Sequence, residues 1–297
     1  MATSSKDTKA AASAARERAA QLKARERRAQ GRNRLLIVAG VLVVAVLFAF
    51  AVKYIADSGG GQVYDSGKVT APSVADASGG ILVNQDGKVG GTPPKGSVRV
   101  DVYVDVMCPV CHQFETINAD TLTTLRENGT IALYYHPVSI LNRNSAGTRY
   151  PTRGASAAVT VAEYDPAHFL AFFGALFDNQ PKENTGGLSN AEIATIATGA
   201  GVPADVVAKF KDGEFTRWVT AATNKASDDG LTGTPWIRAE QQVDLDPGIW
   251  SNTTNLQIVL QYIHDFGLQK YKDSVAAAQA IQATPSPSAT PSPTATP

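Results

Sequence analysis

Residues 97–111 carry the sequence SVRVDVYVDVMCPVC, in which a run of alternating valines ends at a Cys-Pro-Val-Cys motif. From Val98 to Val106 every second residue is valine, and polar or aromatic residues stand between them, a pattern typical of a β-strand. The motif holds the only two cysteines of the sequence, Cys108 and Cys111. Since no other thiol is present to build a structural disulfide, the pair is predicted to be a redox-active dithiol.

A helix is predicted to begin at this motif. Apolar residues recur at helical spacing from Cys108 to about Asn128, where an Asn-Gly pair ends the pattern. A cysteine at a helix start lies beside unpaired N–H groups that favour its thiolate, and such CxxC cysteines have pKa values of roughly 3.5 to 7. Cys108 is therefore the predicted nucleophile. Cys111, on the same helical face but nearer the interior, is the predicted resolving thiol, and Pro109 suits the first turn.

Strands and helices alternate on either side of the motif. The predicted strands are 81–89, a hairpin turned by Asp-Gly, then 97–107, 130–135 and 236–237. Helical patterns fill residues 145–229, where Ser189 and Glu192 form a capping box, and a last helix is expected over 255–266. Strands that flank helices in this order indicate an α/β fold with a helical insertion.

Both ends of the chain differ in composition from the central domain. The predicted boundaries are a basic segment 1–34, a transmembrane anchor 35–56, a flexible Gly/Ser/Asp-rich linker 57–79, a folded domain 80–272 and a disordered Pro/Ser/Thr-rich tail 273–297. The formal net charge of zero therefore combines a basic N-terminus with a slightly acidic remainder.

The uncharged apolar segment 35–52 predicts where the domain lies. Arg34 and Lys53 bracket it, and its length suits the hydrocarbon core of a membrane, which takes about 20 residues. The excess of Lys and Arg before it predicts a cytoplasmic N-terminus and an extracytoplasmic domain. A basic arm alone would also suit nucleic acid, but the apolar span beside it favours the membrane, so no nucleic-acid partner is predicted. The alternative to an uncleaved signal-anchor is a cleaved signal peptide ending near Ala-Phe-Ala at 49–51.

Two short motifs resemble a known family. Residues 104–111, with the Phe-Glu pair at 114–115, are similar to the active-site segment of the DsbA-like branch of the thioredoxin superfamily. The Gly-Thr-Pro sequence at 233–235, placed before a strand, resembles the cis-proline loop of that family. The resemblance implies a thioredoxin-like fold over about residues 80–270 and thiol–disulfide oxidoreductase activity. It also implies a substrate-facing surface formed by Thr234, Pro235, Pro109 and Val110.

Some positions depart from the family pattern. Val110 stands where the strongest oxidases have a histidine, which predicts weaker stabilisation of the thiolate. Val102 stands six residues before the first cysteine, where the family often has a buried acid. Asp105 is instead the candidate for assisting deprotonation of Cys111, and a solvated carboxylate at the strand end is the alternative. Thr234 is shared by oxidising, reducing and isomerising relatives and does not select a direction.

Other kinds of site are weaker explanations of the motif. Residues 108–112 also match CxxCH, the attachment signature of c-type haem, although the proline after the first cysteine and the position at a strand end argue against it. A zinc site needs two further ligands, and His136, His168 and His264 show no motif spacing. No cofactor and no metal are therefore predicted.

The sequence thus predicts a membrane-anchored dithiol oxidase that introduces disulfides into exported proteins through Cys108 and Cys111. A quinone-linked membrane partner for reoxidation follows from the resemblance alone. The alternatives are a reductase of the same fold, for example in cytochrome c maturation, and a non-enzymatic chaperone with a thioredoxin fold. A chaperone groove lined by the Phe-rich segment 166–179 is one form of the latter, although Phe at helical spacing is more often core.

Overall fold

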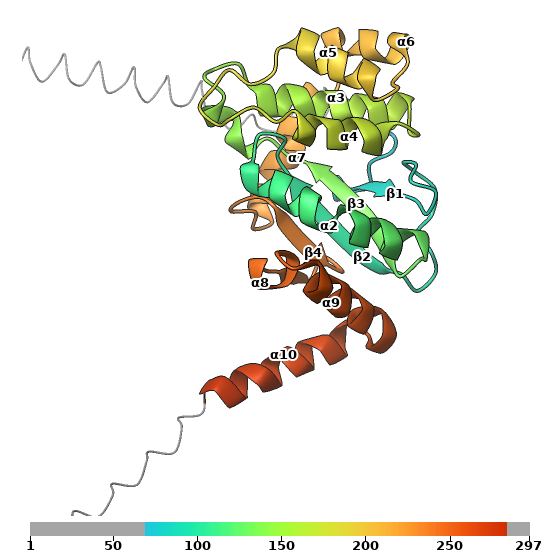
Figure 1. Cartoon of the computed structure of the whole chain (residues 1–297), viewed down its shortest axis with the longest axis vertical. Coiled ribbons are helices and arrows are strands. Elements are labelled where there is room, and N and C mark those ends of the chain that lie inside the picture. Colours follow the sequence, from blue (N-terminus) through green and yellow to red (C-terminus); the bar gives the residue numbers. More distant parts are fainter. Residues whose placement is uncertain (1–68, 284–297) are drawn as a thin grey trace, which may run out of the picture. The chain divides into compact units, whose positions relative to one another are not determined.

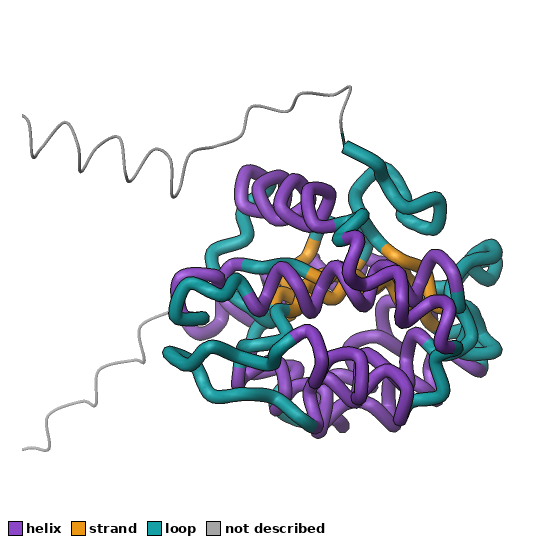
Figure 2. Tube along the Cα trace, turned by 90° about the horizontal axis from the view of Figure 1, so that it is seen from above, coloured by secondary structure: helices purple, strands orange, loops and turns teal. Residues whose placement is uncertain are grey.

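One mixed sheet organises the computed structural model, which describes residues 69–283. Its strand order is β1-β3-β2-β4-β5, with β2 and β3 parallel and all other neighbours antiparallel. The strands are β1 Ile81–Val83, β2 Val98–Val104, β3 Ile131–Pro137, β4 Trp236–Ala239 and β5 Val243–Leu245. Helices lie on both sides of the strands (Figure 2). The predicted α/β architecture is confirmed.

Both faces of the central strand β2 are buried. Its valines pack in the main core together with Cys111 and Phe114 of the following helix. The opposite face presents Asp101 and Tyr103, which are 0% and 5% exposed. Tyr103 packs there against Ala226 and other residues of a second, smaller cluster. The alternation predicts the strand correctly, but its polar positions face other parts of the protein and not solvent.

Helix α2, Pro109–Glu127, follows β2 almost directly and lies across the sheet (Figure 1). It begins where the sequence predicts, because Cys108 is its N-cap residue and Pro109 occupies the first turn. At its other end, Gly129 has a φ of 80°, which a residue with a side chain adopts only at a cost, and the chain turns there into β3. Cys108 is thereby placed just beyond the carboxyl end of a central strand, where α/β folds commonly bind ligands.

Residues 145–229 are mainly helical, as predicted, and the helices α3 to α6 gather on one side of the sheet (Figure 1). The predicted capping box is present, since Ser189 and Glu192 exchange the two expected hydrogen bonds. The five phenylalanines and leucines on the inner side of α4 are buried in the main core, so the Phe-rich segment lines no groove. The elements are η1 Ile140–Asn144, α3 Tyr150–Tyr164, α4 Phe169–Asp178, α5 Asn190–Gly199, α6 Ala204–Val207, η2 Ala208–Asp212 and α7 Thr216–Asp228.

The C-terminal part contains more regular structure than the sequence predicts. The expected last helix is α9, Thr253–Phe266, but α8, Pro247–Trp250, and the short strand β5 precede it. A further helix, α10, covers Leu268–Ala283. The predicted disordered tail is therefore wrong over 273–283, because Ala-rich sequence favours a helix and the start of α10 packs on the core.

The predicted flexible linker is also wrong over residues 69–79. Val69 and Val74 pack against the core, and Asp76 forms an ion pair with Arg99 at 2.7 Å. Few apolar residues are needed to hold this segment in place, because its polar residues Asp76 and Ser78 bind Arg99 of the sheet.

The remaining predictions for the chain ends concern residues that the structure does not describe. The basic segment 1–34, the anchor 35–56, the rest of the linker and residues 284–297 lie outside the described range. Between residues 69 and 283, none of the helices has the length and apolar character required to cross a membrane.

Candidate active site

The two cysteines of the motif differ in their surroundings. Cys108 is the N-cap residue of α2 and is 6% exposed, whereas Cys111 is 0% exposed and belongs to the main core. Both are free thiols in this structure. Val110, between them, is 44% exposed. Cys108 therefore keeps a small exposed surface next to the exposed Val110, whereas Cys111 has none.

The environment separates the acidities of the two thiols. A hydrogen bond from the Cys111 side chain, helped by the Thr234 side chain and the N–H groups of Cys111 and Val110, outweighs burial and lowers the pKa of Cys108 to about 6. Burial raises the pKa of Cys111 well above its ordinary value. Near neutral pH Cys108 is thus largely a thiolate and Cys111 a thiol, which suits the predicted roles of nucleophile and resolving thiol.

The loop before β4 lies directly against Cys108. The peptide bond between Thr234 and Pro235 is cis, and the Cys108 thiol donates to the Thr234 carbonyl oxygen at 3.2 Å. The hydroxyl Oγ1 of Thr234 is buried and has no partner beside the protonated thiol. When Cys108 ionises, its sulfur can no longer donate a hydrogen bond to the Thr234 carbonyl. The thiolate can instead accept a hydrogen bond from the Thr234 hydroxyl. Thr234 therefore provides a hydrogen-bond acceptor, its carbonyl oxygen, for the thiol form of Cys108 and a donor, its hydroxyl group, for the thiolate form.

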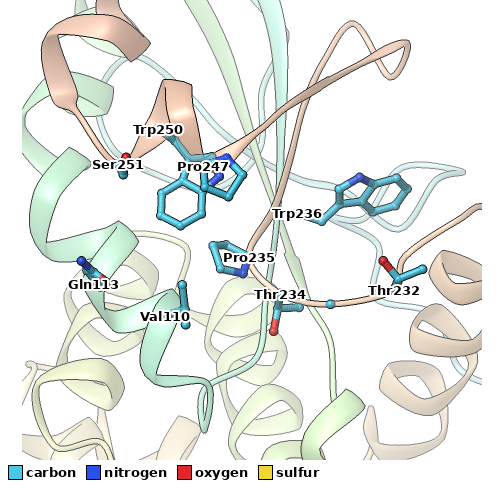
Figure 3. Close-up of a pocket in the computed structure, with 10 residues that line it drawn as sticks. Val110, Gln113, Thr232, Thr234, Pro235, Trp236, Pro247, Trp250 and Ser251 are labelled. Carbon is cyan, nitrogen blue, oxygen red and sulfur yellow. The ribbon is translucent and has the colours of Figure 1, made fainter.

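A cleft of about 550 Å³ opens beside the motif and is lined mainly by apolar side chains. Figure 3 shows Val110 and Gln113 of α2 on one side and the Thr234–Pro235 loop on another, with Trp250 above them. The lining residues are Val110, Gln113, Thr232, Gly233, Thr234, Pro235, Trp236, Pro247, Trp250 and Ser251. Three of the four predicted substrate-facing residues line this cleft, and Pro109 does not.

Asp105 is buried and not solvated at the strand end. Its carboxylate accepts hydrogen bonds from the N–H groups of Met107 and Leu141, each at 2.9 Å. Burial, with a smaller contribution from the neighbouring Cys108, raises its pKa to about 7. Asp105 interacts with Cys111 through its backbone. The carboxylate thus holds the loop before the motif through hydrogen bonds and interacts electrostatically with Cys108. Its role in deprotonating Cys111 stays a prediction.

The residues at the site that were not predicted include Gln113, Trp250 and Gln180. Gln113 lies on the exposed side of α2 two residues after the motif, a position that sequence reasoning can reach. Trp250 of α8 packs edge-to-face on Phe114, with ring centroids 5.7 Å apart, and lines one side of the cleft. Gln180, in the loop after α4, hydrogen-bonds to the backbone of the motif. The last two come from distant parts of the chain and have no local signal.

A second buried acid lies further along α2. The side chain of Glu115 packs against β3, where Tyr135 donates a hydrogen bond to Oε2 at 3.2 Å and Oε1 is buried without a partner. Burial raises the pKa of Glu115 to about 7. Val102, which stands where the related family often has a buried acid, packs in the core. The buried carboxyl group on α2 is that of Glu115.

The histidines have structural roles. His136 is 3% exposed, stacks on Tyr103 and contacts Asp101 at 2.8 Å. Burial lowers the pKa of His136; burial acts to raise the pKa of Asp101, but hydrogen bonds from His136 and Arg99 outweigh it and lower that pKa. His168 and His264 pair with neighbouring aspartates. Among the described residues, no group of three or more His, Cys, Asp or Glu side chains has a geometry suited to a metal ion.

The structure disfavours covalent haem at residues 108–112. Haem attachment requires both cysteine sulfurs to reach the edge of the porphyrin. Cys111 is 0% exposed and lies in the hydrophobic core, between the sheet and α2. The second thioether bond therefore has no room to form.

The chain is similar to proteins of known family. A family model described as thioredoxin matches residues 86–248, more than half of the sequence. The serine/threonine-protein kinase PknE of Mycobacterium tuberculosis is 30% identical over 146 residues, which are 46% of this chain and 26% of that protein. This chain thus matches about a quarter of the kinase's length.

Solved structures extend the similarity to the fold. The reduced disulfide bond oxidoreductase DsbG of Mycobacterium tuberculosis has a TM-score of 0.54 and 26% identity, over 69% of this chain and 97% of that one. Reduced DsbA from the same organism has a TM-score of 0.52 and 26% identity, over 67% and 98%. The matches cover nearly the whole of these two proteins and about two thirds of this chain.

Proposed function

The chain belongs to the thioredoxin family, in its DsbA-like branch, and from this premise we propose that it is an extracytoplasmic dithiol oxidase. Its substrates are exported proteins that carry pairs of cysteine thiols. The general activity, thiol–disulfide exchange on proteins, follows from the family; the direction of electron flow and the location are the proposal.

The reaction starts from the enzyme with a disulfide between Cys108 and Cys111. A substrate thiolate attacks the Cys108 sulfur, a mixed disulfide forms, and the Cys111 sulfur leaves and takes up a proton. A second substrate thiolate then attacks the substrate sulfur of the mixed disulfide and releases the Cys108 thiolate. Two substrate thiols are oxidised to a disulfide, and the enzyme disulfide is reduced to a dithiol.

The proposal rests on one observation: the protein stabilises the thiolate of Cys108, which is the last leaving group of the reaction. Cys108, with its pKa of about 6, is a good leaving group, and a reduced form held by the same hydrogen bonds makes the disulfide oxidising. The cleft beside Val110 and Pro235 gives an unfolded substrate segment an apolar surface on which to lie. These features suit donation of a disulfide better than reduction of one.

The proposed location and reoxidation depend on other parts of the chain. The apolar segment 35–52, with its basic flank, supports a single-pass anchor with the N-terminus in the cytoplasm. An anchored enzyme needs an electron acceptor in the same membrane. We propose that a quinone-linked partner there reoxidises the Cys108–Cys111 dithiol. Cell fractionation with protease protection of the folded domain tests the location.

A redox titration of the purified protein against glutathione tests the direction. A potential near −120 mV is expected for an oxidase, and one near −270 mV would identify a reductase instead. The accompanying activity assay is the oxidative refolding of a reduced, unfolded protein whose activity requires its disulfides.

Two variants make this assay specific. Cys108→Ser is expected to abolish refolding activity, because the reacting sulfur is absent. Cys111→Ser is expected to accumulate a mixed disulfide between Cys108 and the substrate, visible on a non-reducing gel. Refolding activity that survives Cys108→Ser would instead support a chaperone.

A further inference from the structure

Gln180 connects the helical insertion with the backbone of the active-site motif. Its side-chain Nε2 donates two hydrogen bonds, to the carbonyl oxygens of Val106 at 3.1 Å and of Cys108 at 3.0 Å. We infer that Gln180 is a positioning residue, which holds the Cys108 loop so that the helical insertion sets the reactivity of the Cys108 sulfur.

The two carbonyls that Gln180 binds lie on either side of Met107. The Cys108 carbonyl also accepts the N–H groups of Cys111 at 3.0 Å and His112 at 3.2 Å, the first bonds of α2. The Val106 carbonyl belongs to a fully buried residue, and within the described part of the chain its bond from Gln180 is the one that satisfies it. Gln180 thus hydrogen-bonds to both ends of the turn, Val106 and Cys108, that leads from β2 into α2.

Gln180 is itself held firmly. Its backbone N–H donates to the Phe177 carbonyl at 3.0 Å, where α4 ends. Phe177 and the other apolar residues of α4 are buried in the main core, which fixes the position from which the side chain reaches out. Asp105 makes a second connection to the same loop, since it accepts the N–H of Leu141 in η1. The loop is therefore tied to the elements after β3 at two points.

The position of the loop bears directly on the thiolate. The lowered pKa of Cys108 depends on the position of its sulfur relative to the Cys111 thiol, the Thr234 side chain and the N–H groups of Cys111 and Val110. The Val106 and Cys108 carbonyl oxygens carry partial negative charge in the turn that positions this sulfur, and the Gln180 amide offsets it. Without this donor the loop relaxes and the oxygens are uncompensated, so the thiolate loses stability relative to the thiol.

The inference rests on the proposed function only in taking Cys108 as the reacting sulfur. The test measures the rate of alkylation by iodoacetamide against pH, on the reduced full-length chain. Gln180→Met keeps the length of the side chain and removes the donor. Gln180→Lys keeps donors and adds a positive charge. Asn179→Ala is the matched control, because Asn179 is the exposed neighbour and its side chain bonds only within its own helix, to Ala175.

In Gln180→Met, the pKa of Cys108 is expected to rise by about 0.5 to 1 unit, which lowers the ratio of thiolate to thiol about threefold to tenfold at a given pH. The equilibrium with glutathione should shift by a similar factor towards the disulfide form. In Gln180→Lys the pKa should equal or fall below that of the wild type. Asn179→Ala should match the wild type in both measurements.

A Gln180→Met variant with a lower melting temperature but a wild-type alkylation profile and potential would overturn the inference, because Gln180 would then be structural only. If Gln180→Met does not fold, Gln180→Lys decides, and a raised pKa there refutes the inference. An ordinary thiol pKa for Cys108 in the wild type would refute the proposed function as well. A wild-type pKa near 6 that Gln180→Met leaves unchanged would refute this inference alone.

Discussion

Replacing Thr234 with valine removes one hydroxyl group from the site and nearly preserves the shape of the side chain. In the thiol form of Cys108 this hydroxyl is buried without a partner, and in the thiolate form it donates to the sulfur. The substitution should therefore act in opposite directions on the two forms: it removes a stabilising bond from the thiolate and an unsatisfied group from the thiol.

The magnitude follows from the groups that hold the thiolate. Relative to an ordinary cysteine at about 8.5, a pKa of about 6 corresponds to about 3 kcal/mol of net stabilisation. Four donors stabilise the thiolate together, namely the Cys111 thiol, the Thr234 hydroxyl and the N–H groups of Cys111 and Val110. A hydrogen bond to a charged group is worth about 1.5 to 3 kcal/mol, and sulfur is a weak acceptor. With the lower end of that range, Thr234→Val should raise the pKa of Cys108 by about 1 unit, to about 7.

The same change affects stability with a definite sign. Because folding lowers the pKa of Cys108, the thiolate contributes stability above the unfolded pKa and loses it as pH falls through about 6. Reduced Thr234→Val should be about 1 kcal/mol less stable than wild type at pH 9. At pH 5, where the orphan hydroxyl no longer has to be buried, it should be equally or more stable.

The assay is the ultraviolet absorbance of the thiolate against pH, combined with urea unfolding of the reduced protein at the two pH values. Thr232→Val is the matched control, since Thr232 lies in the same loop, is exposed and has no bond to Cys108. A Thr234→Val titration that overlays those of Thr232→Val and the wild type would refute the reasoning, because the hydroxyl would then not hold the thiolate.

Three further substitutions test other parts of the site. Val110→His places a cation near the thiolate, so the pKa of Cys108 should fall by about 1 unit and the potential become more oxidising, as measured by alkylation and glutathione titration. Glu115→Gln removes a carboxyl whose pKa burial raises from 4.5 to about 7, so this carboxyl destabilises the fold as pH rises above about 4.5. The variant should gain about 3 kcal/mol over wild type in urea unfolding at pH 8 and nothing at pH 4. Trp250→Ala should cost about 3 to 5 kcal/mol and weaken binding of an unfolded peptide at the cleft, as measured by calorimetry, whereas unchanged peptide affinity would exclude the indole from the binding surface.

The C-terminal part of the chain shows where local patterns predict too little structure. β5 is three residues long, and only its pairing with β4 makes it a strand. The small and polar residues at the end of α10 are typical of a tail, yet alanine favours a helix once Leu268 and Tyr271 pack against the core. In both elements the contacts that decide the conformation are distant in sequence.

The polar positions of β2 show a second limit. Their alternation with valine suits a strand with one open face, but Asp101 is fully buried because Arg99 and His136 supply its hydrogen bonds. Two of these three residues lie on one strand, and the third comes from β3. The sequence does not show that the two strands bring them together.

By itself the sequence determined that a strand delivers Cys108 to the first turn of a helix, with Cys111 one turn further. These features are local: they follow from residue spacing, capping preference and the direction of the helix dipole. Only the tertiary structure decided what surrounds the sulfur. The Thr234 hydroxyl beside the sulfur, the Gln180 amide on the neighbouring carbonyls and the Trp250 ring in the adjacent cleft come from segments about 70 to 140 residues away. The acidity of a thiol depends on such neighbours in space.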